Sequence, residues 1–281
     1  WADERMEMIM KPMWVWGVVL GLWAGLAFAD QQSEQETLEA LQLIGMERQF
    51  VDLHKVIIRG LNQRRSEGVA SGALSYEELE ALIDQYFDPA LMTRQLAKQL
   101  ATQHDPNRFR ILLSSLRSEQ IQGVRLQIEK AMNEENAANL HNFSRNYDEQ
   151  QLDRQRAYII EGLERASAGN ELNAGVQAMA TLALLRLQET QEGIESQFSE
   201  ELLLQQLYTD YLERGRKVTE IIYRAALGEM SPDALQLSLR VYRSTVVQWF
   251  LGEAVDNMIP VVDEQRKQLL KAVEGPVAAE S

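Results

Sequence analysis

Two segments, DPNRFRILLSSLRS (residues 105–118) and SPDALQLSLRVYRS (residues 231–244), align without a gap at an offset of 126 residues. Each segment begins with a helix-capping residue before a proline, has leucine at its ninth position and ends in Arg-Ser. Proline is accepted at the first helical position because its missing N–H would have no partner there. The alignment therefore predicts two helices that begin alike, one in each half of the chain.

Helical spacing extends over most of the chain. Apolar residues recur every three or four positions from Leu38 to Ala254, which places them on single helix faces. Ser75 and Glu78 form a capping box, and Gly45 and Gly169 each follow a leucine-rich helix at an offset of 124 residues. No segment shows the period of two that is typical of a strand. The sequence predicts an all-α fold of about ten helices in two stacked, repeat-like halves, with no β-sheet.

The predicted organisation has four parts. A leader covers residues 1–29, an N-terminal helical half residues 30–147, a C-terminal helical half residues 148–274, and a flexible tail residues 275–281. The clearest loop is expected over residues 68–73, and a weaker break over residues 142–147 separates the halves. The tail is expected to fray because chain termini are poorly ordered unless packed.

The leader has the pattern of a secretory signal. Lys11 precedes an apolar run over residues 14–28, and Ala27 and Ala29 precede a polar stretch that begins at Asp30. A positive start, a short apolar core and a small-x-small motif predict cleavage after Ala29, with translation starting at Met10. The alternative is an uncleaved anchor in the inner membrane, although the run is shorter than the ~20 residues of a spanning helix. With no cysteine in the chain, no lipid anchor is expected.

The charge of the chain restricts its partners. It has 28 basic and 42 acidic residues, for a net charge of −14. This charge argues against nucleic acid and against an anionic membrane surface, and it is compatible with a basic partner. Membrane contact is expected only through an uncut leader. We expect no cofactor and no metal, and the oligomeric state stays open.

Motifs that carry catalytic chemistry are weak. His54, His104 and His141 are far apart, and none has the preceding glutamate of a Glu-x-x-His metal motif. The segment GVASG (residues 68–72) only approaches a nucleophile elbow and follows no strand. Acidic residues are abundant and are expected to form solvated helix faces, for example at Glu77, Glu78, Glu80 and Asp84.

Two other groups of side chains are candidates for binding. A basic cluster near the end of the first long helix would complement the helix C-terminus or dock an acidic partner; it contains Lys55, Arg59, Arg64 and Arg65. An apolar stripe is expected to belong to the core or, if it is exposed, to line a partner groove; it contains Tyr242, Val246, Trp249, Phe250 and Val255.

The chain resembles the domain of unknown function 2059 family. The resemblance rests on a signal peptide followed by LIGMERQF (residues 43–50), on a helix that runs from an Arg-Ser pair to Ala131, and on residues 231–250 in the second half. It implies an exported, all-helical protein of Gram-negative bacteria, of the two-copy type, with no assigned activity. The family's Ser-Pro-x-Gly motif is missing after Ser118 and after Ser244.

Three functions are compatible with the sequence. The first is a non-catalytic periplasmic protein that binds a partner, such as another envelope protein, or maintains the envelope. The second is a carrier or chaperone with an apolar groove between the halves. The third is a hydrolase with a site assembled from scattered acids and one histidine. A histidine–carboxylate pair in a cleft would favour the hydrolase, and a continuous apolar groove would favour the carrier.

Overall fold

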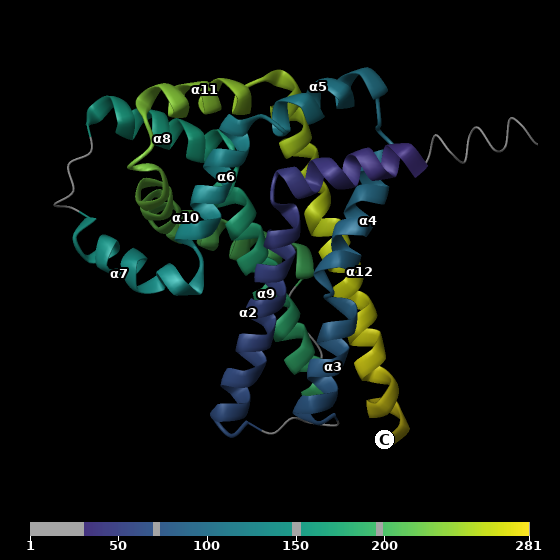
Figure 1. Cartoon of the computed structure of the whole chain (residues 1–281). Helices are drawn as coiled ribbons and strands as arrows, with labels where there is room; N and C mark the ends of the chain where they lie inside the picture. Colours follow the sequence, from purple (N-terminus) through teal and green to yellow (C-terminus); the bar gives the residue numbers. More distant parts are fainter. Residues whose placement is uncertain (1–30, 70–73, 148–152, 195–198, 281) are drawn as a thin grey trace, which may run out of the picture.

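The computed structural model describes residues 31–69, 74–147, 153–194 and 199–280, and within these ranges all regular structure is helical (Figure 1). The predicted all-α fold of about ten helices is thereby confirmed. The predicted cleavage site at Ala27, Ala29 and Asp30 lies outside the described residues. A helix over residues 31–43 is followed by α2 Met46–Ser66, α3 Tyr76–Tyr86, α4 Pro89–Ala101, α5 Pro106–Leu116, α6 Glu119–Ala131, the 3₁₀ turn η1 Glu134–Asn136, α7 Ala137–Arg145, α8 Arg154–Ala166, α9 Gly169–Glu192, α10 Glu200–Leu227, α11 Pro232–Tyr242 and α12 Thr245–Glu280.

Local capping sets where several helices begin. Ser75 accepts the Glu78 amide, and the Glu78 carboxylate reaches back to the Ser75 amide, so the predicted capping box is present. Asp88, Asp105 and Ser231 each cap a helix whose first residue is proline. Such a cap contributes about 1 kcal/mol. These starts were predictable because every hydrogen bond involved joins residues two or three apart in the chain.

The helices of the first half recur in the same order in the second. The helix over residues 31–43 and α2 correspond to α8 and α9, and the α3–α4 pair corresponds to the single long helix α10. Then α5 and α6 correspond to α11 and α12, at the offset of the two aligned segments. A residue in the left-handed region precedes both α2 and α9: Gly45 with φ 79° and Ala168 with φ 55°.

One side chain in each half ties together the ends of two helices. Gln122 Nε2 donates to the Leu43 carbonyl at 3.2 Å and to the Leu116 carbonyl at 2.7 Å. Gln248 Nε2 donates to the Ala166 and Tyr242 carbonyls at 2.6 and 2.7 Å. The last carbonyls of a helix have no partner within the helix, so each amide satisfies two of them at once. The equivalent contacts show that the repeat extends to individual hydrogen bonds.

The halves exchange their last helices. Helix α12 packs against α3, α4 and α5 of the first half as well as against α9, whereas α6 packs against α10 and α11 of the second. Helices α2 and α9, which correspond to each other, also lie side by side (Figure 1). Gly60 permits this approach, because a Cβ added there would lie 2.3 Å from Leu184 Cδ1. The two halves therefore share one packed interior.

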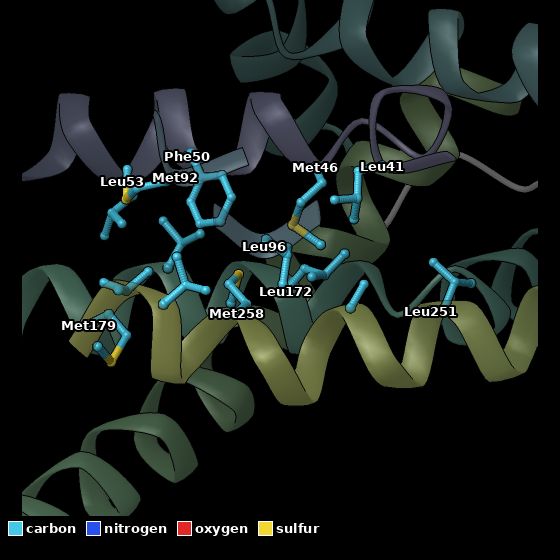
Figure 2. Packing of buried hydrophobic residues seen from close by; sticks show 14 of the residues in the cluster. Leu41, Met46, Phe50, Leu53, Met92, Leu96, Leu172, Met179, Leu251 and Met258 are labelled. Atoms are coloured by element: carbon cyan, nitrogen blue, oxygen red, sulfur yellow. The ribbon is translucent and has the colours of Figure 1, made fainter. Parts of the chain in front are cut away.

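The centre of this interior lies where α2, α4, α9 and α12 meet (Figure 2). Phe50, Met92 and Leu96 are fully buried there, as is Met258 from the other half at 2% exposure. Burying a side chain of this size contributes about 1.5–3 kcal/mol. Because residues from both halves fill this layer, neither half encloses its own core.

Three local predictions differ from the structure. The residue that turns the chain before α9 is Ala168, so the equivalent of Gly45 is one position earlier than Gly169. Residues 142–145 belong to α7 and form no break there. Helix α12 continues to Glu280, past Glu274, where a flexible tail was expected to begin.

We expect Gln248→Ala to lower the free energy of unfolding by about 1 kcal/mol, because two helix-end carbonyls lose their donor. Urea denaturation followed by circular dichroism measures this loss. The control is Gln268→Ala on the same helix. Its amide donates to the exposed Glu264, and the loss of stability should stay below about 0.5 kcal/mol. Equal losses in the two variants would contradict the role of Gln248 as a bridge.

Candidate functional site

The main candidate site is a cleft of about 550 Å³ between α8, α9 and α10, here called the acidic cleft. Its volume lies in the range of typical ligand sites. Five glutamates and two arginines line it, together with Asn170, Thr209 and Leu212: Glu161, Glu164, Glu171, Glu213, Glu220, Arg165 and Arg216.

Three of these carboxylates lack an ion-pair partner. Glu161 pairs with Arg165 at 3.1 Å, and Glu220 pairs with Arg224 at 2.7 Å. Within the described residues, Glu164, Glu171 and Glu213 form no salt bridge. One carboxylate oxygen of Glu171, Oε2, is also buried without a hydrogen-bond partner. The cleft therefore carries an excess of negative charge.

Burial and mutual repulsion perturb the acids of the cleft. Burial raises the pKa of Glu164 above its ordinary value, and the neighbouring Glu171 carboxylate raises it further. Burial, followed by Glu171 and Asp256, also raises the pKa of the Tyr208 phenol. A bound cation would relieve this repulsion, since an opposite charge nearby favours the ionised carboxylate.

A close approach of α9 and α10 forms the wall of the cleft. Asn170 is 7% exposed, and its amide donates to the Leu212 carbonyl at 2.9 Å. Its oxygen accepts from the Thr219 hydroxyl at 3.4 Å. A Cβ at Gly215 would lie 2.8 Å from that oxygen, so the helices approach this closely only with glycine there. Polar contacts of the buried Asn170 thus join α9 and α10 next to Glu171 and Glu213.

The histidines do not come together. His104 lies 2.8 Å from Glu36, its side chain is 9% exposed, and its ring lies against Phe109. His54 lies 2.8 Å from the exposed Asp84, and His141 is exposed on α7. Buried histidine–carboxylate contact therefore exists, but neither pair lines the acidic cleft. A hydrolase was expected to have a histidine–carboxylate pair in a cleft, and the acidic cleft contains no such pair among the described residues.

The apolar stripe near the start of α12 belongs mainly to the core. Tyr242 is 7% and Phe250 1% exposed, which corrects the alternative that they form an exposed groove. Val246 is half-buried, and Val255 packs against the same core. Trp249 is also half-buried, and the guanidinium carbon of Arg108 lies 3.6 Å from the centroid of its ring. An arginine from the other half thus covers the one large aromatic side chain of the stripe that remains partly exposed.

The basic cluster at the end of α2 contacts acidic residues of the same chain. Arg64 pairs with Glu192 at 3.4 Å, and Arg65 pairs with Glu77 at 2.6 Å. Arg59 donates to the Lys55 carbonyl. These contacts favour a structural role over docking of an acidic partner.

A buried ion network was not predicted from the sequence. Arg266 is 1% exposed and makes two hydrogen bonds to Glu200, at 3.0 and 2.5 Å, and two to Asp263, at 3.2 and 2.7 Å. Arg186 is also buried, and its Nε lies 3.3 Å from the same Glu200 carboxylate. Glu200 thus joins the beginning of α10 to α9 and α12.

Neither a metal centre nor a membrane-crossing helix occurs in the part of the chain that the structure describes. The described residues contain no group of three or more histidine, aspartate or glutamate side chains placed to hold a metal ion. None of the described helices combines the length and the apolar character that crossing a membrane requires.

We expect Glu200→Gln to lower the free energy of unfolding by about 1–3 kcal/mol, because the buried guanidinium groups of Arg186 and Arg266 lose one of their charged acceptors and keep only Glu189 and Asp263. Urea titration of the wild type and the variant gives this difference. Glu201→Gln, at the exposed neighbouring position, should change stability by less than about 0.5 kcal/mol. A Glu200→Gln variant as stable as Glu201→Gln would show that the network contributes nothing to stability.

Comparisons with family models, with curated proteins and with solved structures found no match for the chain. The resemblance to the domain of unknown function 2059 family stays a prediction. Function is therefore inferred from the geometry of this chain alone.

Proposed function

We propose that this protein is an exported, non-catalytic binding protein whose acidic cleft receives a basic segment of a partner protein, such as another envelope protein. The observation that carries the proposal is the presence of three carboxylates without ion pairs, on Glu164, Glu171 and Glu213, in one cleft of about 550 Å³. Lysine and arginine side chains on a partner would supply the missing positive charge. Export is supported by the pattern of the leader.

The acidic cleft and the whole chain both carry a net negative charge. A net charge of −14 gives the molecule a negative field, and a cleft of the same sign concentrates that field where a basic ligand would bind. The two histidine–carboxylate pairs lie elsewhere, so the proposal assigns no acid–base reaction to the cleft.

Glu164 is the position where stability and binding should oppose each other. Its folded-state pKa is raised, so the folded protein binds a proton more readily at this carboxyl than the unfolded chain does. Ionisation of Glu164 at neutral pH therefore costs stability, and this cost disappears below its ordinary pKa of 4.5. A carboxylate that lowers stability yet faces an open cleft is typical of a binding site.

We expect Glu164→Gln to stabilise the protein at pH 7 by less than about 1 kcal/mol, because solvent screens a half-exposed group. The gain should vanish as the pH falls below 4.5, where the carboxyl is protonated in both states. Thermal unfolding across this pH range measures the effect. Glu161→Gln is the control in the same cleft, because it removes a partner of Arg165 and should give no gain.

Binding is tested by fluorescence anisotropy with a labelled lysine-rich peptide and a glutamine-rich peptide of equal length. We expect saturable binding of the lysine-rich peptide only, weakening as salt is added. A triple variant with Glu164→Gln, Glu171→Gln and Glu213→Gln should lose this binding. The control variant removes the same charge at exposed positions outside the cleft, with Glu47→Gln, Glu229→Gln and Asp233→Asn. Equal affinity of the two triple variants would reject the cleft as the binding site.

A further inference from the structure

A second, smaller cavity of about 90 Å³ lies where the two halves meet, and here it is called the inter-half cavity. Helices α2 and α6 of the first half supply one side of it. The turn before α9 and helices α9 to α12 of the second half supply the other. Both halves are therefore needed to form it. Its volume has room for several water molecules, and so for one compact organic molecule.

Two ion pairs from the first half line the cavity. On α2, Arg48 pairs with Asp52 at 3.2 Å, and on α6, Arg125 pairs closely with Glu129. All four side chains are partly exposed, with 25–35% of their surface accessible. Gly45, which directly precedes α2, lies beside the second pair, because a Cβ there would be 3.7 Å from Glu129 Oε1 and 3.8 Å from Arg125 Cδ. Both pairs line the same cavity. This side of the cavity thus offers two positive and two negative groups.

The second half supplies buried apolar side chains and hydroxyls. Leu172 and Leu251 are 6% and 4% exposed. The Tyr223 hydroxyl lies 2.6 Å from the Ser167 hydroxyl, so these two groups satisfy each other. Tyr242 is 7% exposed and lines the cavity, yet its hydroxyl has no hydrogen-bond partner among the described residues.

The unpaired Tyr242 hydroxyl is the observation that points to a ligand. Among the described residues, the fully buried polar atoms that lack a hydrogen-bond partner do not include this hydroxyl, so it reaches the open space of the cavity although the residue as a whole is 7% exposed. A hydroxyl on the cavity wall that has no partner within the protein is available to bond to a molecule that enters the cavity.

We propose that the inter-half cavity binds a small zwitterion, in chemical class a free α-amino acid. Each ion pair carries one positive and one negative group. A ligand with a single charge would therefore be repelled by one member of each pair as well as attracted by the other. In a zwitterion, the carboxylate faces Arg48 and Arg125 while the ammonium group faces Asp52 and Glu129. The apolar side chain then lies against Leu172 and Leu251, and the Tyr242 hydroxyl bonds to the ligand.

The proposal is tested by isothermal titration calorimetry of the full chain with L-alanine and L-valine, and with acetate and methylamine as probes of each charge alone. We expect saturable binding of at least one amino acid, and binding of the single ions at least about tenfold weaker. Absence of amino acid binding, which would leave a cavity filled with water only, overturns the proposal. Binding of acetate with the same affinity as the amino acids also overturns the proposal.

Two tyrosine variants separate a ligand role from a structural one. Tyr242→Phe should weaken amino acid binding by up to about tenfold, the effect of one hydrogen bond, while the melting temperature without ligand stays equal or rises. Tyr223→Phe, which breaks the bond to Ser167, should lower the melting temperature. The proposal fails if Tyr242→Phe leaves affinity unchanged, or if it lowers the melting temperature as much as Tyr223→Phe does.

The charged side of the cavity is tested with Asp52→Asn combined with Glu129→Gln, which removes both acceptors of the ammonium group. We expect this variant to lose its preference for amino acids over acetate. The triple variant of the acidic cleft should keep wild-type affinity for amino acids, so failure of one site can be distinguished from failure of the other. If the double variant still preferred amino acids over acetate as the wild type does, the proposal of a zwitterionic ligand would be wrong.

Discussion

The architecture depends on how one glutamine in each half, Gln122 and Gln248, holds two helix ends together. A helix end buried in a turn must find donors for its last carbonyls, and here one amide serves two helices at once. That contact joins the first turn of α6 and of α12 to the ends of two earlier helices. From there each helix packs against the other half, α6 against α10 and α11 and α12 against α3 and α4. The shared interior and the inter-half cavity both follow from this packing.

The helix starts could be predicted from the sequence because their causes are local. A capping side chain and a proline act within one turn, so Asp88, Asp105 and Ser231 were identified correctly. The turn before α9 was misplaced because glycine is the usual left-handed residue, and Gly169 stands next to Ala168, which actually adopts that conformation. The exchange of α6 and α12 had no signal, since both helices show the same apolar spacing whichever half they pack against.

The candidate site was not predictable for a related reason. The glutamates of the acidic cleft come from α8, α9 and α10, and acidic residues are frequent on every exposed helix face of this chain. What distinguishes Glu164, Glu171 and Glu213 is that none of them forms a salt bridge within the described residues, although Arg165 and Arg216 line the same cleft. This difference depends on packing and not on spacing. The network at Glu200 is the opposite case, because Arg266, 66 residues away, donates to both oxygens of that carboxylate. Similar residues thus form ion pairs in one place and stay without an ion pair in another.

The exchange of the last helices also determines the order in which the chain can fold. Helices α3, α4 and α5 are complete before residue 117, yet the helix that covers them begins only at Thr245. During synthesis the apolar faces of α3, α4 and α5 therefore stay uncovered until nearly the whole chain has been made. Folding then proceeds as one event and not half by half. For the export proposed above, this delay would mean that no finished core has to be pulled apart before the chain crosses a membrane.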